Sequence, residues 1–280
     1  MDGFTDTIPA SGIHPSAVIH PRAEIGRDVR IGPFCTIGPD VVLEDGVTLI
    51  SHVVVDGITR IGEGTTVYPF VSIGLPPQDV KYRNEPTRCE IGARTQIREH
   101  CSIHRGTPGG RGVTNVGDGC MLMAVVHVAH DCRIGNGVVI ANNVVMGGHC
   151  RIDDYAVIGG SAALHQGVHI GRGAMIGGLL GIGGDVLPFA MVTGEREGWV
   201  AGLNIIGMKR RGFDRPAMHT LRAVFQRLFG AGAGVRSERI DSVREEYGDE
   251  PLVAEALEFI ANQGKRGLQR AKFGPEADED

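Results

Sequence analysis

His130 and Asp131 are adjacent in the segment HVAHDC (127–132), and a histidine beside a carboxylate is suited to general-base chemistry. The imidazole could take a proton from an attacking hydroxyl group while the carboxylate orients the ring. The sequence numbers of Gly148 and His130 differ by eighteen, and the backbone N–H of Gly148 could hold a developing oxyanion. These groups together suit acyl transfer, provided that the fold brings residues with this spacing into contact.

Further polar side chains have the same spacing. His149 follows Asp131 at this interval, and Gln166, which comes directly after His165, follows Gly148 at the same interval. In a fold that stacks such residues, they form one polar patch on three successive layers. HVAHDC could instead be an ordinary polar turn, but the aligned polar groups in the neighbouring layers favour a site.

The elements that would position this patch follow from an aliphatic residue at every sixth position. A period of six fits neither an α-helix nor a plain strand, and it is typical of a parallel β-helix in which each hexapeptide supplies one short strand and one corner. Three hexapeptides close one coil, and consecutive coils lie roughly 4.8 Å apart. The aliphatic positions are Ile13, Ile19, Ile25, Ile31, Ile37, Leu43, Leu49, Val55, Ile61, Val67, Ile73, Ile91, Ile97, Ile103, Val116, Leu122, Val128, Ile134, Ile140, Met146, Ile152, Ile158, Leu164, Ile170, Ile176 and Ile182.

The period is interrupted twice. The interval from Ile73 to Ile91 equals three hexapeptides, which we interpret as one distorted coil that keeps its register. The interval from Ile103 to Val116 is one position longer than two hexapeptides, and because it is not a multiple of six, it predicts a looped-out insertion. Long loops that leave a regular solenoid usually carry function.

After Ile182 the period of six fades, and from Asp214 the apolar residues follow helical spacing. Asp214 can cap a first helix, and Pro216 suits its first turn. We expect helices at 214–230, 237–247 and 251–262, in a domain that could cover the open end of the β-helix. The expected division of the chain is an N-terminal tail (1–12), a β-helix (13–203) with loops near 74–90 and 105–115, a helical C-terminal domain (204–273) and an acidic tail (274–280).

The composition argues against several classes of protein. A net charge of -5 and a pI of about 6.1 argue against a nucleic-acid binder with a broadly basic face. The chain has no apolar run of about 18 residues that would predict an integral membrane protein, and its polar start lacks a targeting pattern, so we expect a cytoplasmic location.

The 43 glycines fit a fold with a corner in every hexapeptide. The six cysteines show no C-x-x-C spacing and occupy a slot for small inward side chains, which predicts reduced core thiols.

Several segments resemble a known family. They are QDVKY (78–82), EPTR (85–88), IHRGT (103–107), HVAHDC (127–132), GGH (147–149), LHQ (164–166) and N-x-x-G-x-KRRGF (204–213). In this order, and with the hexapeptides, they are similar to the acyl-carrier-protein:UDP-N-acetylglucosamine O-acyltransferases of lipid A biosynthesis. The resemblance implies a mostly β protein, a left-handed parallel β-helix with a C-terminal α-helical domain, that forms a homotrimer with active sites between subunits.

The resemblance also implies a reaction, in which a 3-hydroxyacyl group passes from acyl carrier protein to the 3-hydroxyl group of UDP-N-acetylglucosamine. The phosphopantetheine of the carrier protein holds the acyl group, and neither a further cofactor nor a metal is implied. His130 matches the general base, Asp131 the group that orients it, and Gly148 the oxyanion-binding amide. Gly178 matches the position that sets acyl-chain length, where a glycine should admit a longer chain. Positions that match substrate contacts are Gln78, Asp79 and Lys81, from the facing subunit, together with His127, His149, His165, Gln166, Asn204, Arg210 and Arg211.

Two departures from the family pattern bear on the acyl site. Ile206 stands where the family often has an acidic residue, and the segment 194–202 is one residue longer than expected. Lys209, Arg210, Arg211 and Arg215 form a basic cluster at which an acidic carrier protein could dock, or which is only a solvated entry to a helix.

Other functions fit these residues less well. A related enzyme could acylate a 3-amino UDP-sugar. The sister N-acyltransferase carries an N-terminal uridine-binding domain, for which hexapeptides that begin at residue 13 leave no room. A hexapeptide zinc hydratase would need a different ligand spacing from H-x-x-H with an adjacent Asp. A scaffold without activity would not explain the polar patch.

Overall fold

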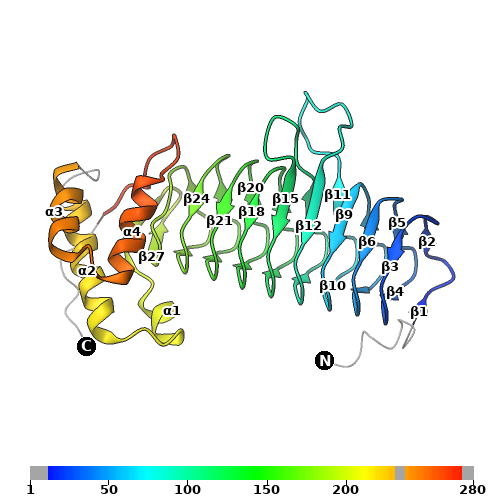
Figure 1. Ribbon diagram of the computed structural model, residues 1–280, viewed down its shortest axis with the longest axis horizontal. Helices are drawn as coiled ribbons and strands as arrows, with labels where there is room; N and C mark the ends of the chain where they lie inside the picture. The colour runs from blue at the N-terminus through cyan, green and yellow to red at the C-terminus, as the bar shows by residue number, and fades with distance from the viewer. Residues whose placement is uncertain (1–11, 231–236, 273–280) are drawn as a thin grey trace.

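The computed structural model describes residues 12–230 and 237–272. Its longer part is a three-sided coil of short strands, and a small helical domain lies at one end (Figure 1). Each coil contributes one strand to each of three sheets, in which the pairing from β1 to β26 is parallel. The predicted acidic tail lies outside the described residues, as does nearly all of the predicted N-terminal tail.

The strands of the three sheets follow in their spatial order. The first sheet contains β1 (Gly12–Ile13), β4 (Arg30–Ile31), β7 (Thr48–Leu49), β10 (Thr66–Val67), β13 (Gln96–Ile97), β16 (Met121–Leu122), β19 (Val139–Ile140), β22 (Val157–Ile158), β25 (Met175–Ile176), β27 (Ala190–Gly194) and β28 (Gly198–Leu203). The second contains β2 (Val18–Ile19), β5 (Thr36–Ile37), β8 (Val54–Val55), β11 (Ser72–Leu75), β14 (Ser102–His104), β17 (His127–Val128), β20 (Val145–Met146), β23 (Ala163–Leu164) and β26 (Gly181–Ile182). The third contains β3 (Glu24–Ile25), β6 (Val41–Leu43), β9 (Ile58–Ile61), β12 (Arg88–Ile91), β15 (Val113–Val116), β18 (Arg133–Ile134), β21 (Arg151–Ile152) and β24 (His169–Ile170).

The aliphatic side chain of each hexapeptide points into the coil. From Ile31 to Ile182 these side chains are at most 3% exposed, and they form one continuous core. The six cysteines belong to this core as free thiols, which confirms their prediction. Burial raises the pKa of the Cys89 thiol to about 12, so this thiol stays protonated at neutral pH.

The first interruption of the period is not the distorted coil that we expected. Ile91 pairs with Ile61, and Ile73 pairs with Ile103, so each partner lies five hexapeptides away instead of three. The interval from Ile73 to Ile91 is therefore one regular hexapeptide step plus an excursion of two further hexapeptides, residues 76–87 between β11 and β12. That interpretation was wrong because the excursion is itself a multiple of six residues.

The second interruption is the predicted insertion. Val116 pairs with Ile91, so this coil is seven positions longer than the regular three hexapeptides. The extra residues lie in segment 105–112, between β14 and β15. Both segments project from the same edge of the coil (Figure 1).

Glycine has two roles in this winding. Positive φ angles occur at the corners, but many corners carry other residues, among them Asp131 (φ 59°) and His149 (φ 62°). The glycine that directly follows an aliphatic position is needed for another reason. A Cβ on Gly32 would lie 1.7 Å from the carbonyl oxygen of Ile50 in the next coil. The high glycine content therefore reflects close stacking of coils as well as corner angles, which corrects the prediction from corners alone.

The C-terminal part begins with the antiparallel pair β27 and β28, followed by the short helix α1 (Ile205–Arg210). The three helices expected from apolar spacing are α2 (Arg215–Phe229), α3 (Ser237–Tyr247) and α4 (Pro251–Ala261). Asp214 caps α2 by accepting a hydrogen bond from Ala217 N at 2.8 Å. A bidentate ion pair joins the helices to the coil, in which two guanidinium nitrogens of Arg172 donate to the two carboxylate oxygens of Glu255 at 2.8 and 2.5 Å. Among the described residues, no helix is both long and apolar enough to cross a membrane.

Candidate active site

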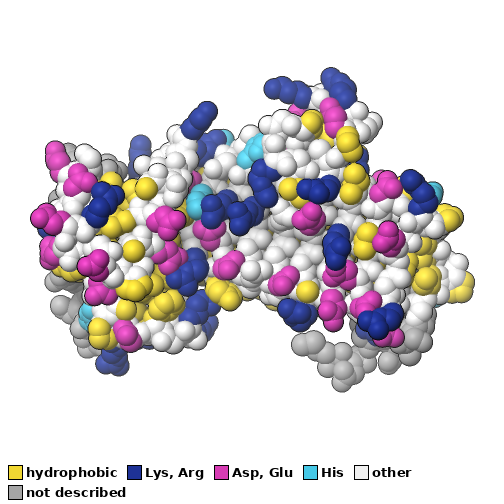
Figure 2. Space-filling model, viewed as in Figure 1, with side chains coloured by type: hydrophobic (Ala, Val, Ile, Leu, Met, Phe, Trp, Pro, Cys, Tyr) yellow, Lys and Arg dark blue, Asp and Glu magenta, His cyan; other side chains and the backbone are white. Residues whose placement is uncertain are grey.

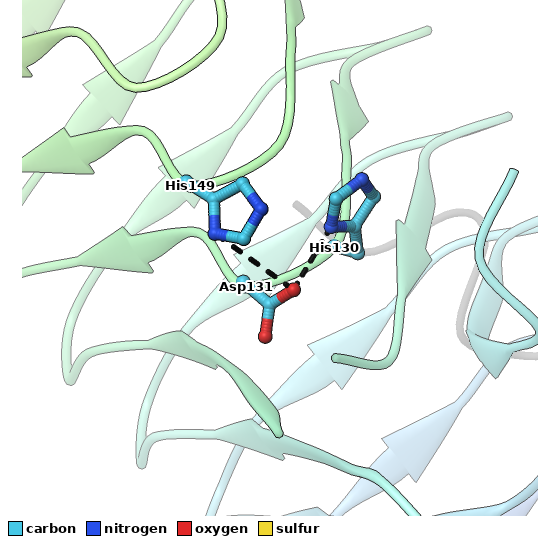
Figure 3. Close-up of side chains that lie close together, drawn as sticks. All are labelled: His130, Asp131 and His149. Carbon is cyan, nitrogen blue, oxygen red and sulfur yellow. Dashed lines mark hydrogen bonds and ion pairs between the residues drawn. The ribbon is translucent and has the colours of Figure 1, made fainter. Parts of the chain in front are cut away.

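The candidate site lies on the corners that follow β17, β20 and β23 in the second sheet. β17 pairs with β20 in a register that sets Val128 beside Met146, so residues that follow them at equal distance stack in neighbouring coils. His130 and Asp131 occupy the first corner, and His149 lies above them in the next coil (Figure 3). The stacking expected from the sequence is therefore present at this corner.

His130 and Asp131 form a hydrogen-bonded pair. Nδ1 of His130 lies 2.9 Å from Oδ2 of Asp131, and the side chains are 14% and 0% exposed. A hydrogen bond from Nδ1 to the carboxylate leaves Nε2 free to accept a proton. The pair therefore has the arrangement of an oriented general base.

Gly148 lies against the imidazole of His130. A Cβ on Gly148 would lie 2.4 Å from Cε1 and 2.6 Å from Nε2 of that ring. Only a glycine leaves the ring in its observed position. The backbone of Gly148 is thus beside the proton-accepting nitrogen, where an amide donor could meet a developing oxyanion.

The carboxylate of Asp131 is held by segment 105–112, a contact that the sequence did not predict. Thr107 donates from Oγ1 to Oδ2 at 2.6 Å, and Gly112 N donates to Oδ1 at 3.0 Å. Burial acts to raise the pKa of Asp131, but hydrogen bonds from Thr107 and His130 outweigh it, and the pKa lies below its usual value. The carboxylate is therefore ionised at neutral pH. The sequence signals for Thr107 were its place in the insertion and in the segment IHRGT (103–107), and neither connects it to Asp131.

His149 is the third titratable group at this corner. Its Nδ1 lies 3.9 Å from Oδ2 of Asp131, and its ring meets the His130 ring edge-on at 5.0 Å (Figure 3). Ligand atoms of His130, Asp131 and His149 lie within 4.8 Å of one another, a spacing that a metal ion could bridge if the side chains turned. Because Asp131 already accepts several hydrogen bonds, the observed arrangement favours proton transfer.

Two further histidines lie beside the pair, on the strand side. His127 bonds through Nδ1 to the hydroxyl of Ser102 at 2.8 Å, and burial lowers its pKa. His104, which the sequence did not single out, meets the His127 ring edge-on at 4.9 Å. Burial and the nearby His127 and His130 lower the pKa of His104 to about 4. His104 is therefore neutral at neutral pH, and it adds no positive charge to the site.

His165 and Gln166 extend the site by one coil. Both are exposed, and the backbone oxygen of Gln166 accepts a hydrogen bond from Nε of Arg266 at 2.5 Å. A cavity of about 660 Å³ begins at His165 and runs between the last coils and segment 266–270. Histidine side chains reach the surface between the projecting loops and the helical end (Figure 2).

The predicted residues of segment 76–87 do not contact His130 within one chain. Gln78 and Lys81 are exposed, and Val80 at the tip is 90% exposed. The Asp79 carboxylate accepts only the backbone N–H of Lys81, at 2.9 Å, among the hydrogen bonds of the described residues. The segment therefore presents these side chains outward.

The remaining predicted residues lie on other corners. Asn204 is buried, caps α1 by accepting from Gly207 N at 3.0 Å and donates to the oxygen of Gly173, also at 3.0 Å. Arg211 lies 4.3 Å from the centre of the Tyr155 ring, and Arg210 is exposed at the end of α1. Gly178 follows β25, on the corner between the first and second sheets. One chain thus brings together the residues from His127 to Gln166 but not these.

Comparison with known proteins identifies close relatives. Residues 185–269 match the family described as UDP-N-acetylglucosamine O-acyltransferase, domain 2, and residues 22–57 and 114–148 match the bacterial transferase hexapeptide family. The acyl-[acyl-carrier-protein]–UDP-N-acetylglucosamine O-acyltransferase of Azorhizobium caulinodans is 52% identical over 241 residues, which cover 86% of this chain and 88% of the relative.

Solved structures agree with this similarity. A UDP-N-acetylglucosamine acyltransferase crystal structure is 40% identical with a TM-score of 0.89, and the match covers 94% of this chain and 100% of that one. The UDP-N-acetylglucosamine O-acyltransferase of Moraxella catarrhalis is 38% identical with a TM-score of 0.87, covering 92% and 99%. These matches confirm the predicted fold class, a left-handed parallel β-helix with a C-terminal α-helical domain.

Proposed function

Because the chain belongs to the UDP-N-acetylglucosamine O-acyltransferase family, we propose that it transfers a 3-hydroxyacyl group from acyl carrier protein to the 3-hydroxyl group of UDP-N-acetylglucosamine. This reaction is the first step of lipid A biosynthesis. The observation that carries the assignment is the contact of the His130 and Asp131 pair with the backbone of Gly148.

In the proposed mechanism, Nε2 of His130 takes the proton of the sugar hydroxyl as its oxygen attacks the thioester carbonyl carbon. Asp131 stabilises the imidazolium that forms, through the hydrogen bond at 2.9 Å. The carbonyl oxygen becomes an oxyanion, which the N–H of Gly148 holds. When the intermediate collapses, the C–S bond breaks and the leaving sulfur takes the proton from His130. The products are the O-acylated sugar nucleotide and the carrier protein with a free thiol, and His130 is neutral again.

We further propose that the working enzyme is a homotrimer whose sites are shared between subunits. Two observations support this. Asp79, Lys81, Arg211 and Gly178 lie away from His130 within one chain, so a second copy would have to supply them. A row of exposed rings, Phe34, His52, Phe70 and His100, also runs along one corner with centroids 4.9 to 5.0 Å apart, which suits packing against another copy.

The activity is tested with carrier-bound 3-hydroxyacyl chains and UDP-N-acetylglucosamine. Replacing the base, His130→Ala, should lower the rate by about 10²–10⁴. The exposed His20 serves as the control, and His20→Ala should keep the wild-type rate. A wild-type rate in His130→Ala would contradict the mechanism. The same assay with a 3-amino acceptor decides between oxygen and nitrogen as the attacking atom.

Subunit sharing is tested by mixing two inactive variants, His130→Ala and Asp79→Ala, during refolding. If a site combines His130 of one copy with Asp79 of another, random assembly should restore about one site in four. If the mixture stays as inactive as its components, the site lies within one chain.

A further inference from the structure

The insertion in segment 105–112 closes on one group, the carboxylate of Asp131. Thr107 contacts it twice, through Oγ1 at 2.6 Å from Oδ2 and through its backbone N–H at 3.1 Å from the same oxygen. Gly112 N donates to Oδ1 at 3.0 Å. Among the described residues, these donors and His130 supply the hydrogen bonds that the carboxylate accepts.

Resting on the proposed function, we propose that Thr107 is a positioning residue for the reaction and that Gly106, Thr107, Gly110 and Gly112 form a clasp that fixes Asp131 against His130. The clasp spans the whole insertion, because Thr107 lies near its start and Gly112 at its end. Thr114, just beyond the end, accepts the backbone N–H of Asp131 at 2.8 Å. The aspartate is thus held by both its backbone and its side chain.

The glycines of the clasp are shaped to the carboxylate. A Cβ on Gly110 would lie 2.4 Å from Cγ and from Oδ2 of Asp131. A Cβ on Gly106 would lie 2.2 Å from the backbone nitrogen of Val113, at the end of the loop, and 2.9 Å from Oδ1 of Asp131. Side chains at these positions would push the loop away from the carboxylate, so the backbone can reach it only where no Cβ intervenes. Gly109, by contrast, has open space around it.

The clasp has a chemical consequence at His130. Asp131 is fully buried and sits at a φ of 59°, in the left-handed region, so its orientation depends on the contacts that surround it. Donors fixed on both oxygens stop the carboxylate from turning, and Oδ2 stays aimed at Nδ1 of His130. The ring then keeps its proton on Nδ1, and Nε2 faces outward as the base. Without the clasp, the proton of the His130 ring could move from Nδ1 to Nε2, and Nε2 could then no longer act as the base.

The test uses the full chain with matched variants. Thr107→Val keeps the shape of the side chain but removes the hydroxyl donor, and Thr107→Ser keeps the donor. Gly110→Ala should displace the clasp from the carboxylate of Asp131. Thr59→Val and Gly109→Ala are the controls: Thr59 is also a buried threonine with a hydrogen bond, to the oxygen of Asp56, but it does not touch the pair. Each variant is assayed for kcat and for KM of the sugar nucleotide, and ¹⁵N spectra of the His130 ring report which nitrogen carries the proton.

We expect Thr107→Val to lower kcat about tenfold or more with KM within about twofold, because the lost hydrogen bond is to an ionised group. Thr107→Ser should retain kcat within about threefold. Thr107→Val and Gly110→Ala should show a mixture of ring tautomers, whereas the wild type and both controls should show Nδ1–H. A wild-type kcat and tautomer in Thr107→Val would overturn the proposal. It would also fall if Thr107→Val changed only thermal stability, as Thr59→Val should.

The two proposals fail in different ways. If the wild-type chain shows no acyl transfer, the proposed function is wrong, but the ring spectra still decide whether the clasp fixes His130. If the wild type is active and the spectra of Thr107→Val are unchanged, only the clasp is wrong.

Discussion

One added methyl group at Gly148 should disable the proposed enzyme through a single contact. A Cβ there would lie 2.4 Å from Cε1, 2.6 Å from Nε2 and 2.9 Å from Nδ1 of His130. Since carbon atoms in contact stay roughly 3.5 Å apart, the imidazole would have to move by about 1 Å. Such a move strains or breaks the bond to Asp131 and misdirects Nε2. A displacement of about 1 Å at a reacting group costs roughly 10² in rate, or about 2.7 kcal/mol of activation free energy.

The assay compares kcat/KM of Gly148→Ala with that of the wild type and of Gly181→Ala. Gly181 lies in the strand β26, and its added Cβ would meet only Arg196 O, at an ordinary 3.6 Å. The control should therefore keep its activity. Thermal melts of all variants separate a displaced ring from a protein that has not folded.

A double-mutant cycle isolates the contact. If the methyl group acts through the imidazole, Gly148→Ala with His130→Ala should be no slower than His130→Ala alone, and the smaller side chain should recover the melting temperature lost in Gly148→Ala. The reasoning is refuted if Gly148→Ala keeps its rate within about threefold of wild type, or if the two losses of rate multiply in the double variant.

Three further predictions concern chain length, pH and thiols. Gly178→Met should shorten the preferred acyl chain in an assay with carrier-bound chains of graded length. Gly178→Ala is the control for the effect on the backbone, because a Cβ at this position would already lie 3.1 Å from Gly160 O. An unchanged acyl profile in Gly178→Met would contradict the prediction. Burial acts to raise the pKa of Asp153, but the hydrogen bond to His169 at 2.7 Å and the contact with Arg151 outweigh it, so the pKa lies below its usual value. The ionised carboxylate therefore stabilises the folded protein above about pH 4, and this stabilisation is lost as the pH falls through the lowered pKa. Asp153→Asn should therefore reduce the free energy of unfolding by about 1.5–3 kcal/mol at pH 7 and by less at pH 3, measured by denaturant melts, and an equal loss at both values would contradict it. The six buried cysteines should resist a thiol reagent at pH 8 until the chain is unfolded with denaturant, and rapid labelling of the native protein would contradict their burial.

The stacking of His130, Gly148 and Gln166 could be predicted from the sequence because no insertion falls between Val116 and Ile182. In that stretch each coil takes three hexapeptides, so position in the sequence gives position on the surface. The proximity of His130, Asp131 and Gly148 could therefore be predicted from their spacing in the sequence alone.

The face of the coil could not be predicted across segment 76–87. Its length of two hexapeptides preserves the phase of the repeat, so the aliphatic positions resume in register at Ile91, while the paired residues move from three hexapeptides apart to five. The excursion is revealed by the pairing of strands, in which Ile61 lies beside Ile91 and Ile73 beside Ile103. A repeat shows which side chains point inward, but not which of three sheets they join.

The contact of Thr107 with Asp131 was missed for a related reason. Thr107 lies in a segment that follows no repeat, so no spacing rule connects the two residues. Family resemblance alone predicted Gly178, Asn204 and Arg211 as site residues. Within one chain these residues lie away from His130. Loops and shared sites depend on contacts that a periodic pattern does not encode.

The two ends of the coil differ in a way that should govern how the protein opens. Ile13 is 48% exposed and apolar side chains reach the surface around β1 to β3, whereas the other end is joined to β27, β28 and the helices (Figure 2). Because each coil touches only its neighbours, backbone amides should exchange with deuterium first near Ile13 and then in order along the coils. His130 lies several coils from that end, so transient fraying at the start of the solenoid should leave catalysis undisturbed.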